Sequence, residues 1–198
     1  MTRKLVVSVY ISLDGVVQDP VGMENSGLGN WVGPYTRGPE GDELMREELW
    51  AAEIALMGRT TYEGFAAVWP TLNDPAGFAR RLNAMRKYVA STTLQRADWA
   101  NTTILSDDVP GAVRRLKEED GGDILVYGSA GLVPSLLPHG LVDQVHMLIY
   151  PVVLGRGTRL FPEGYAGAFA LADLRRLESG MVHAVYSPAE SSQGAAGQ

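Results

Sequence analysis

Three apolar, strand-like segments of the sequence are each followed by residues with hydroxyl groups, and two of them also by glycines. The first is followed by an arginine as well. The segments are "MGRTTYEG" at 57–64, "YVASTTL" at 88–94 and "LVYGSAGLV" at 125–133. Backbone N–H groups at a glycine turn, together with hydroxyl and guanidinium groups, are donors that bind phosphate. We therefore predict ligand contacts from Gly58, Arg59, Thr60, Thr61, Ser91, Thr92, Gly128, Ser129 and Gly131.

Strand-like and helix-like stretches alternate along most of the chain and must position these residues. The apolar patterns predict strands at 4–13, 54–58, 87–91, 102–105, 123–128, 144–155, 170–179 and 181–187. Helices are predicted at 42–53, 59–68, 78–85, 109–119 and 130–138. Helices between strands indicate a parallel sheet covered on both faces, and Ser179-Gly180 indicates a final hairpin. The expected fold is a three-layer α/β/α sandwich around a mostly parallel sheet of about eight strands, with a C-terminal antiparallel hairpin.

The three glycine and hydroxyl segments follow strands that are expected to be parallel. Parallel strands place their carboxyl ends on one edge of a sheet, and open α/β sheets bind ligands at that edge. Two helix N-termini, Arg59 and several hydroxyls there suit an extended cofactor that carries several phosphates. The sequence G-x-x-x-x-G-K-[ST] of phosphate-binding ATPases is absent from the chain.

Ser129 also permits a second interpretation, because a serine between a strand and a helix can be a hydrolase nucleophile. The nucleophile elbow requires G-x-S-x-G, and Gly131 supplies the second glycine while Tyr127 occupies the place of the first. The bulky tyrosine disfavours the strained elbow. We therefore expect Ser129 to be a hydrogen-bond donor rather than a nucleophile.

The composition disfavours several classes of function. The chain has 198 residues, no cysteine and a formal charge of -6, so thiol chemistry is excluded and polyanionic partners would be repelled. We predict no nucleic-acid partner, no membrane partner and a cytoplasmic location. His139, His146 and His183 are scattered without an i,i+4 pair, so no metal site is expected. One domain is predicted over 1–187, followed by a disordered tail over 188–198.

Four motifs in a fixed order resemble those of a known superfamily. They are "MGRTTYE", "ASTTL", "ILVYGSAGL" and "PVVLGRGTRLFPEG". Over residues 5–186 the chain is similar to the dihydrofolate reductases and the RibD C-terminal reductases of riboflavin biosynthesis. The resemblance implies NADPH as the cofactor, with Arg59, Thr60 and Thr61 at its phosphates. Ser91 and Thr92 would flank the adenosine. The turn residues Gly128, Ser129, Ala130, Gly131 and Leu132 would hold the pyrophosphate and the nicotinamide side, and Tyr127 before them would form the floor of the site between cofactor and substrate.

Two aspartates, Asp42 and Asp14, are the candidates for the carboxylate that acts on the substrate. Asp42 takes the position at which dihydrofolate reductases hold the pterin ring, and it could equally be the N-cap of the helix at 42–53. Asp14 belongs to a Ser-Leu-Asp-Gly turn that the RibD reductases share, and it could equally be a turn aspartate. Further candidates for substrate contact are Trp31 and Tyr35 in the long loop over 16–41, and Met45 on the helix that follows.

The resemblance implies an NADPH-dependent reductase that transfers hydride to a pterin-like or aminopyrimidine-type molecule. Two departures leave the choice between a folate and a riboflavin precursor open. Val16 follows Ser-Leu-Asp-Gly where the RibD enzymes carry a basic residue, and the Trp-Asn-Leu-Pro stretch of dihydrofolate reductases is missing. The alternative is a non-catalytic protein that binds a nucleotide, flavin or pterin on the same fold. Apolar residues on both faces of 144–153 and 181–187 indicate a homodimer that covers these strands.

Overall fold

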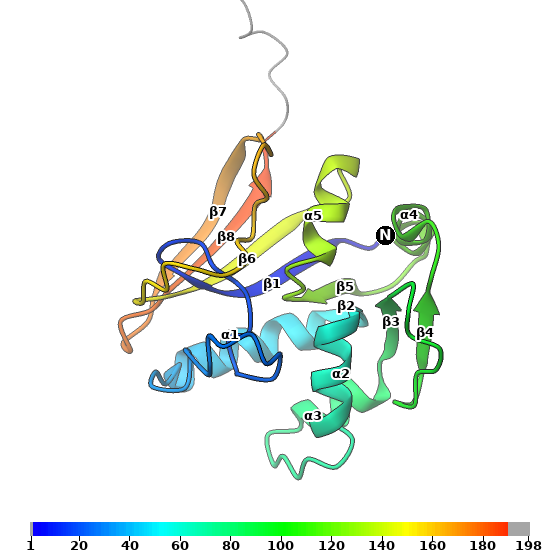
Figure 1. The fold of residues 1–198 in the computed structure, drawn as a ribbon, viewed down its shortest axis with the longest axis horizontal. Helices are drawn as coiled ribbons and strands as arrows, with labels where there is room; N and C mark the ends of the chain where they lie inside the picture. Colours follow the sequence, from blue (N-terminus) through cyan, green and yellow to red (C-terminus); the bar gives the residue numbers. More distant parts are fainter. Residues whose placement is uncertain (1, 190–198) are drawn as a thin grey trace, which may run out of the picture.

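The computed structural model describes residues 2–189, which contain one eight-stranded sheet in the order β4-β3-β2-β5-β1-β6-β8-β7 (Figure 1). The strands are β1 (Leu5–Ser12), β2 (Ala52–Gly58), β3 (Arg86–Ala90), β4 (Thr102–Leu105), β5 (Asp123–Tyr127), β6 (Gln144–Tyr150), β7 (Phe169–Arg176) and β8 (Val182–Pro188). The helices are α1 (Gly38–Ala51), α2 (Arg59–Val68), α3 (Phe78–Ala84), α4 (Val109–Glu118) and α5 (Leu132–Leu136). None of these described helices combines the length and apolar character needed to cross a bilayer.

The six strands from β4 to β6 are all parallel, whereas β8 pairs antiparallel with β6 and β7 antiparallel with β8. This confirms the predicted mostly parallel sheet with a C-terminal hairpin. The hairpin turns at Gly180, whose φ of 86° is a conformation that glycine adopts without steric cost. The first two residues of the predicted tail are ordered, because Pro188 ends β8 and Ala189 N–H donates to the Ala168 carbonyl at 2.9 Å, whereas residues 190–198 lie outside the described residues.

Apolar clusters on both faces of the sheet make it a three-layer structure (Figure 1). The central strand β1 is buried on both sides, because Val7 packs in the cluster that includes α4 and α5 while Val6 packs in the cluster of α1, α2 and α3. Successive strand residues point to opposite faces, so the consecutive apolar residues Leu5, Val6 and Val7 suit such a doubly covered strand. The predicted α/β/α layering is confirmed.

Two helix starts differ from the predictions. The first helix begins at Gly38 rather than at Asp42, because Pro39 occupies its first turn, where a missing N–H costs nothing. The interpretation of Asp42 as an N-cap is therefore wrong. The helix predicted from Ala130 begins at Leu132, since the turn before it continues through Ser129, which has a φ of 57°.

The long loop before α1 is held against the segment that joins β6 to β7. Leu13 N–H donates to the Val152 carbonyl at 2.8 Å, and Val17 N–H donates to the Thr158 carbonyl at 3.0 Å. Val17 itself is 5% exposed. These contacts hold the first residues of the loop over 13–37 against that segment, so this part of the loop is packed beside the sheet.

Candidate functional site

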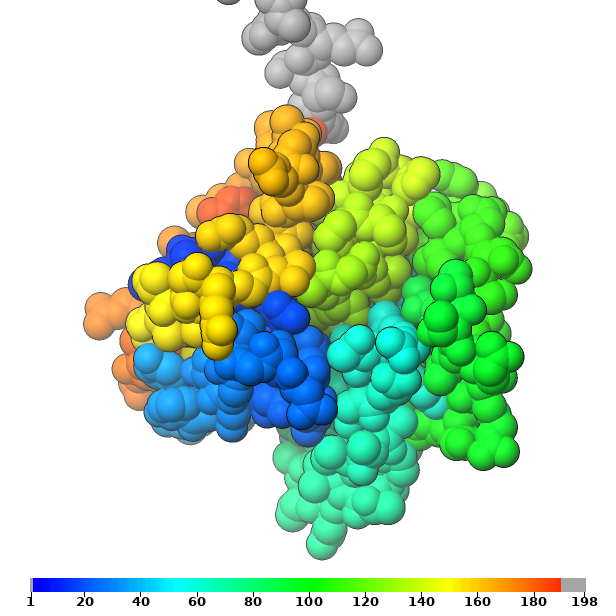
Figure 2. Space-filling model, viewed as in Figure 1, coloured from blue at the N-terminus to red at the C-terminus, as the bar shows by residue number. Residues whose placement is uncertain are grey.

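A cavity of about 510 Å³ lies at the carboxyl ends of β2, β3, β4 and β5. Its walls come from the starts of α2 and α5, the segment after β3 and the loop over 13–37. Figure 2 shows this blue loop, the cyan-to-teal α2 and the yellow-green α5 segment meeting on one face of the molecule. Ten of the predicted ligand contacts line the cavity, which are Gly58, Arg59, Thr60, Thr61, Ser91, Thr92, Ser129, Ala130, Gly131 and Leu132.

The sheet topology explains why segments distant in sequence meet at this cavity. β2 lies between β3 and β5, and Gly58 is paired with Ala90 in the parallel register of β2 and β3. Arg59 and Ser91 therefore leave the sheet next to each other. On the other side, Gly128 N–H donates to the carbonyl of Ser8 at 3.0 Å, which holds the turn after β5 against β1.

Ser129 ties the turn after β5 to the end of β2. Its Oγ accepts a hydrogen bond from Gly58 N–H at 2.7 Å and lies 3.0 Å from the Thr61 hydroxyl. A Cβ at Gly58 would lie 3.1 Å from this oxygen, so the close approach favours glycine there. Because the Ser129 hydroxyl is engaged with a backbone amide and another hydroxyl, its position supports a structural and donor role rather than a nucleophile.

The polar character of the cavity suits phosphate and sugar groups. Eight residues of its wall carry hydroxyl groups, and Arg59 is the one cation among the described wall residues. Arg59 lies 3.4 Å from Glu63, and both side chains are about half exposed. Exposed ion pairs of this kind contribute about 0–1 kcal/mol, so little holds the Arg59 guanidinium away from an anionic ligand.

The wall also contains residues that the sequence does not predict, among them Gln18 and Glu24 of the loop before α1. Their loop is shaped by Asp19, which is 1% exposed and accepts hydrogen bonds from Glu24 N–H at 2.9 Å and from the Ser26 hydroxyl at 2.6 Å. Burial and the charge of Asp19 raise the pKa of Glu24 above its ordinary value. The sequence offers no periodic pattern in this loop, and only its Asp, Asn and Gly content indicates a turn-rich segment.

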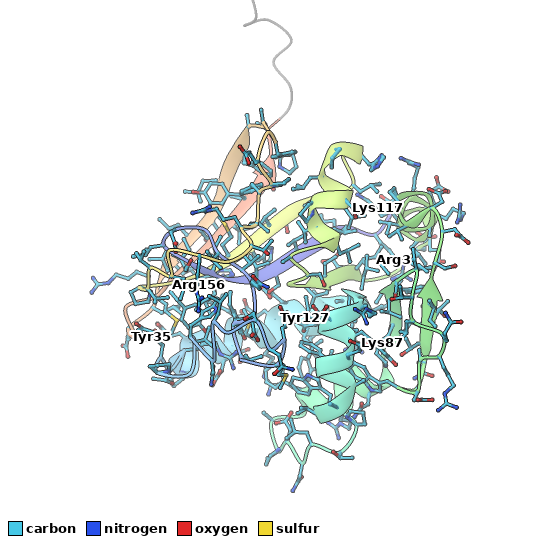
Figure 3. All side chains as sticks on the ribbon, in the orientation of Figure 1. Arg3, Tyr35, Lys87, Lys117, Tyr127 and Arg156 are labelled. Atoms are coloured by element: carbon cyan, nitrogen blue, oxygen red, sulfur yellow. The ribbon has the colours of Figure 1, made fainter. Side chains whose placement is uncertain are left out.

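Two predicted contacts, Tyr127 and Gly128, do not line the cavity. Tyr127 packs in the cluster under α2, with its ring 5.5 Å from that of Phe65 (Figure 3). Side chains alternate along β5, so Tyr127 shares the face of Leu125 rather than pointing out of the sheet edge. The prediction that Tyr127 forms the floor of the site is wrong, because its ring belongs to the core.

Trp31, Tyr35 and Met45, the predicted substrate contacts, lie in an apolar cluster around Tyr150. The rings of Trp31 and Tyr35 are 5.6 Å and 5.9 Å from that of Tyr150. Trp31 is 6% exposed and its indole N–H donates to the Gln18 carbonyl. Figure 3 labels Tyr35 beside α1, away from Tyr127. None of the three lines the cavity, and their packing supports a role in the core.

Asp42 is also distant from the cavity wall. Its side chain is 60% exposed and lies 2.9 Å from the guanidinium of Arg37. Arg37 in turn contacts the hydroxyl of Tyr10. The geometry therefore supports a surface ion pair at the start of α1, and it does not bring Asp42 to the other predicted residues.

Asp14 anchors the segment that follows β6. One carboxylate oxygen accepts from the Ser12 hydroxyl at 2.7 Å and from Leu154 N–H at 3.1 Å, and the other accepts from Gly155 N–H at 2.8 Å. These hydrogen bonds lower the pKa of Asp14 to about 2. A carboxylate so fully engaged is a poor proton donor at neutral pH, and the geometry favours the turn-aspartate interpretation.

Replacing Asp14 with asparagine is expected to loosen the segment around Leu154 and Gly155. The amide NH₂ would face backbone N–H donors, so one or more of the three hydrogen bonds is lost. Amide hydrogen exchange at 154 and 155 should become faster in the variant. In the wild type, protection of these two amides from exchange should be complete above pH ~4, the pKa of aspartate in an unfolded chain. It should be lost as the pH falls toward 2, where the folded carboxylate takes up a proton. Unchanged exchange at these amides would contradict the anchoring role.

Two of the histidines are not scattered, which corrects the expectation from the sequence. His146 Nδ1 lies 2.7 Å and His183 Nε2 lies 3.3 Å from the same oxygen of Glu48. The pairing of β6 with β8 brings them together. His139 follows α5 and is exposed.

Comparisons with known proteins agree with this architecture. The RibD C-terminal domain family model matches residues 3–183. The protein YyaP of Bacillus subtilis (strain 168) is 27% identical over 188 residues, which cover 93% of this chain and 94% of YyaP. A solved protein from Shewanella sp. PV-4, attributed to riboflavin biosynthesis, has a TM-score of 0.73 at 16% identity and covers 96% of this chain and 100% of its own. Dihydrofolate reductase of Enterococcus faecalis, in complex with NADP(H), has a TM-score of 0.57 at 14% identity. The match covers 96% of this chain and 100% of the reductase chain.

Proposed function

Because this chain belongs to the RibD C-terminal domain family, we propose that it is a reductase that binds NADPH in the cavity at the ends of β2, β3 and β5. The observation that carries the proposal is the convergence of the glycine, hydroxyl and arginine residues from three separate strand ends on one cavity. A single glycine turn is common in any α/β protein. The ends of β2, β3 and β5 together place polar groups along one cavity wall, and this suits an extended ligand with several polar groups.

The wall residues fit such a cofactor. A Cβ at Gly131 would have no atom within 4 Å, so the backbone is open to a ligand at this point. Thr60 and Thr61 at the start of α2 offer hydroxyls beside free backbone N–H groups, where the helix dipole favours negative charge. Arg59 supplies the charge that would distinguish NADPH from NADH, since its guanidinium can form a paired contact with a phosphate. When bound, NADPH supplies a hydride.

Glu24 is the residue that we propose to hold a proton at the substrate. Reduction of a C=N or C=O bond requires a proton as well as a hydride, and general acids work best with a pKa near the ambient pH. Glu24 lines the cavity, and its burial and the neighbouring Asp19 raise its pKa in that direction. Asp14 and Asp42 do not line it. We keep a pterin-like or aminopyrimidine-type heterocycle as the proposed substrate class.

A homodimer remains part of this proposal, but at a different strand. The sequence predicts that a partner covers β6 and β8, whereas each of these two strands pairs with a strand on both sides. β7 is the outer strand of the sheet and exposes Leu171 and Leu174, which are 52% and 58% accessible. An open strand edge with apolar side chains favours association. We propose that a second copy of the chain covers this hairpin, which the molecular mass of the particle in solution tests.

Titration of the protein with NADPH and NADH, followed by intrinsic tryptophan fluorescence, tests the cofactor. Arg59→Met is expected to weaken NADPH binding about 10- to 100-fold, since a charge-assisted hydrogen bond contributes ~1.5–3 kcal/mol, and to leave NADH binding nearly unchanged. Arg86→Met is the matched control, because Arg86 is similarly exposed but lies at the opposite end of β3. Equal losses for both cofactors would remove the 2'-phosphate role of Arg59. Binding without consumption across pterin and aminopyrimidine compounds would favour the non-catalytic alternative.

Glu24→Gln is expected to lower turnover about 100-fold, within the range that a general acid contributes, with little change in NADPH affinity. The amide keeps the shape of the side chain but cannot donate a proton. The rate of NADPH oxidation with a compound that the wild type reduces is the measurement. Glu43→Gln, an exposed carboxylate on α1, is the control. Turnover equal to that of the wild type would exclude Glu24 as the acid.

A further inference from the structure

A second group of chemically active side chains lies away from the cofactor cavity, under α1. Glu48, His146 and His183 each direct one donor atom to a common point, and these three atoms lie within 4.8 Å of one another. The Glu48 side chain is 5% exposed, that of His183 is 4% exposed and that of His146 is 16% exposed. Burying three polar side chains beneath a helix lowers the stability of the fold unless hydrogen bonds or a bound ion compensate for the lost water contacts.

The sheet register builds this group. In the antiparallel pair β6 and β8, His146 lies opposite Val185 and His183 opposite Leu148, so the two histidines are diagonal neighbours on one face. Their rings are 5.7 Å apart. Glu48 reaches this face from α1, which covers it. The arrangement therefore depends on three elements from distant parts of the sequence.

A second layer of hydrogen bonds orients two of the three side chains. The Ser8 hydroxyl donates to one oxygen of Glu48 at 2.7 Å, which leaves the other oxygen directed at both histidines. The Gln144 side-chain oxygen lies 3.3 Å from His146 Nε2, where it can accept the Nε2 proton when Nδ1 binds a metal ion. Metal-binding histidines and carboxylates have such supporting partners. His183 Nδ1 is buried without a hydrogen-bond partner among the described residues.

The surroundings of the group favour a cation. A cavity of about 360 Å³ adjoins it, and the wall carries the carboxylates of Glu47, Glu48, Asp123 and Asp173 against the single arginine Arg175. Two neutral imidazoles and one carboxylate are a donor set that binds divalent transition metals.

We propose that Glu48, His146 and His183 form a binding site for a divalent transition-metal ion, with its remaining coordination positions open to the adjoining cavity. Two ligands on one such ion lie at most about 4.2 Å apart, given metal–ligand distances of ~2.1 Å. The donor atoms already lie at 2.7 Å and 3.3 Å for two of the three pairs. Small side-chain adjustments are therefore sufficient to hold the ion.

Cobalt and zinc binding to tag-free protein, first stripped with a chelator, test this site. One equivalent of Co²⁺ should give the visible absorption bands of a low-symmetry nitrogen and oxygen site, and one equivalent of Zn²⁺ should raise the unfolding temperature and displace the cobalt spectrum. Glu48→Gln and His146→Gln should weaken Co²⁺ binding by about 100-fold or more, since loss of even a supporting partner costs 10–100-fold. His139→Gln is the matched control and should bind as the wild type, because His139 is exposed and outside the group.

The absence of a cobalt spectrum and of a zinc-dependent shift in folded wild-type protein would overturn the proposal. A spectrum retained in Glu48→Gln, or lost in His139→Gln, would equally overturn it. Because the buried variants can fail to fold, nuclear magnetic resonance of the wild type supplies an independent measurement. Co²⁺ should shift or broaden the imidazole resonances of His146 and His183 and spare those of His139, and uniform effects on all three histidines would contradict the site.

Discussion

Replacing Gly131 with phenylalanine should abolish NADPH binding while leaving the fold intact. Gly131 has a φ of -93°, which any residue adopts, and a Cβ there would meet no atom within 4 Å. The glycine lines the cavity, so a large side chain would occupy space that the cofactor requires. A loss of ~3 kcal/mol in the free energy of NADPH binding raises the dissociation constant by more than about 100-fold.

Fluorescence titration with NADPH measures this effect, and thermal unfolding confirms that the variant is folded. Gly131→Ala is the matched control, because one methyl group leaves most of the cavity free and should cause a smaller loss. Wild-type affinity in Gly131→Phe would place the cofactor elsewhere on the molecule. Since the substitution leaves the Glu48, His146 and His183 group untouched, cobalt binding should be unchanged in the same protein.

Lys87→Met is expected to lower the free energy of unfolding by about 2–4 kcal/mol, because it leaves several buried carbonyl groups without a donor. The Lys87 side chain is completely buried in β3, and its ammonium donates to the carbonyls of Leu82, Asn83 and Met85 at 2.8–3.1 Å. It also lies 4.7 Å from the centre of the Trp99 ring. Lys87 therefore caps the carboxyl end of α3.

Urea denaturation at several pH values measures this contribution. Burial lowers the pKa of Lys87 to about 8, whereas an unfolded lysine has a pKa of ~10.4. Between these values the unfolded chain holds a proton that the folded chain has released, so the stability of the wild type should rise with pH relative to that of the variant. Lys4→Met, at an exposed lysine before β1, is the control and should change little. Equal stabilities of Lys87→Met and the wild type would show that the carbonyls find other donors.

The contrast between Lys87 and Arg59 shows what the sequence could predict. Arg59 follows a strand and opens a helix, so local pattern and parallel topology together place it at the sheet edge. Lys87 lies inside a predicted strand, and its charge gives no sign of full burial, because the carbonyls that accept its hydrogen bonds come from the preceding helix and its connection. The strands and the sheet edge at their carboxyl ends were predictable for the same reason as the position of Arg59. Apolar periodicity and turn residues are signals that can be recognised within a few neighbouring residues.

Predictions that required knowledge of side-chain direction or of long-range contact were less successful. Trp31 was assigned to the substrate because loop aromatics can stack on a heterocycle, yet a ring from β6 covers it. Glu24 was missed because its position in the cavity depends on the carboxylate of Asp19, which shapes the loop. His146 and His183 seemed unrelated because antiparallel register, not sequence spacing, makes them neighbours.

The place of β1 in the sheet has a consequence for the order in which the chain can fold. β1 precedes the other seven strands of the sheet in the sequence, yet it pairs with β5 and β6, as in Leu5 with Ile124 and Val6 with Gln144. Its apolar residues have no strand partner until most of the polypeptide has left the ribosome. Pairings so distant in sequence slow folding and prolong the exposure of a strand that can aggregate. A nascent chain that ends before β6 would therefore present β1 with one side unpaired, and we expect chaperones to protect β1 until β6 has been synthesised.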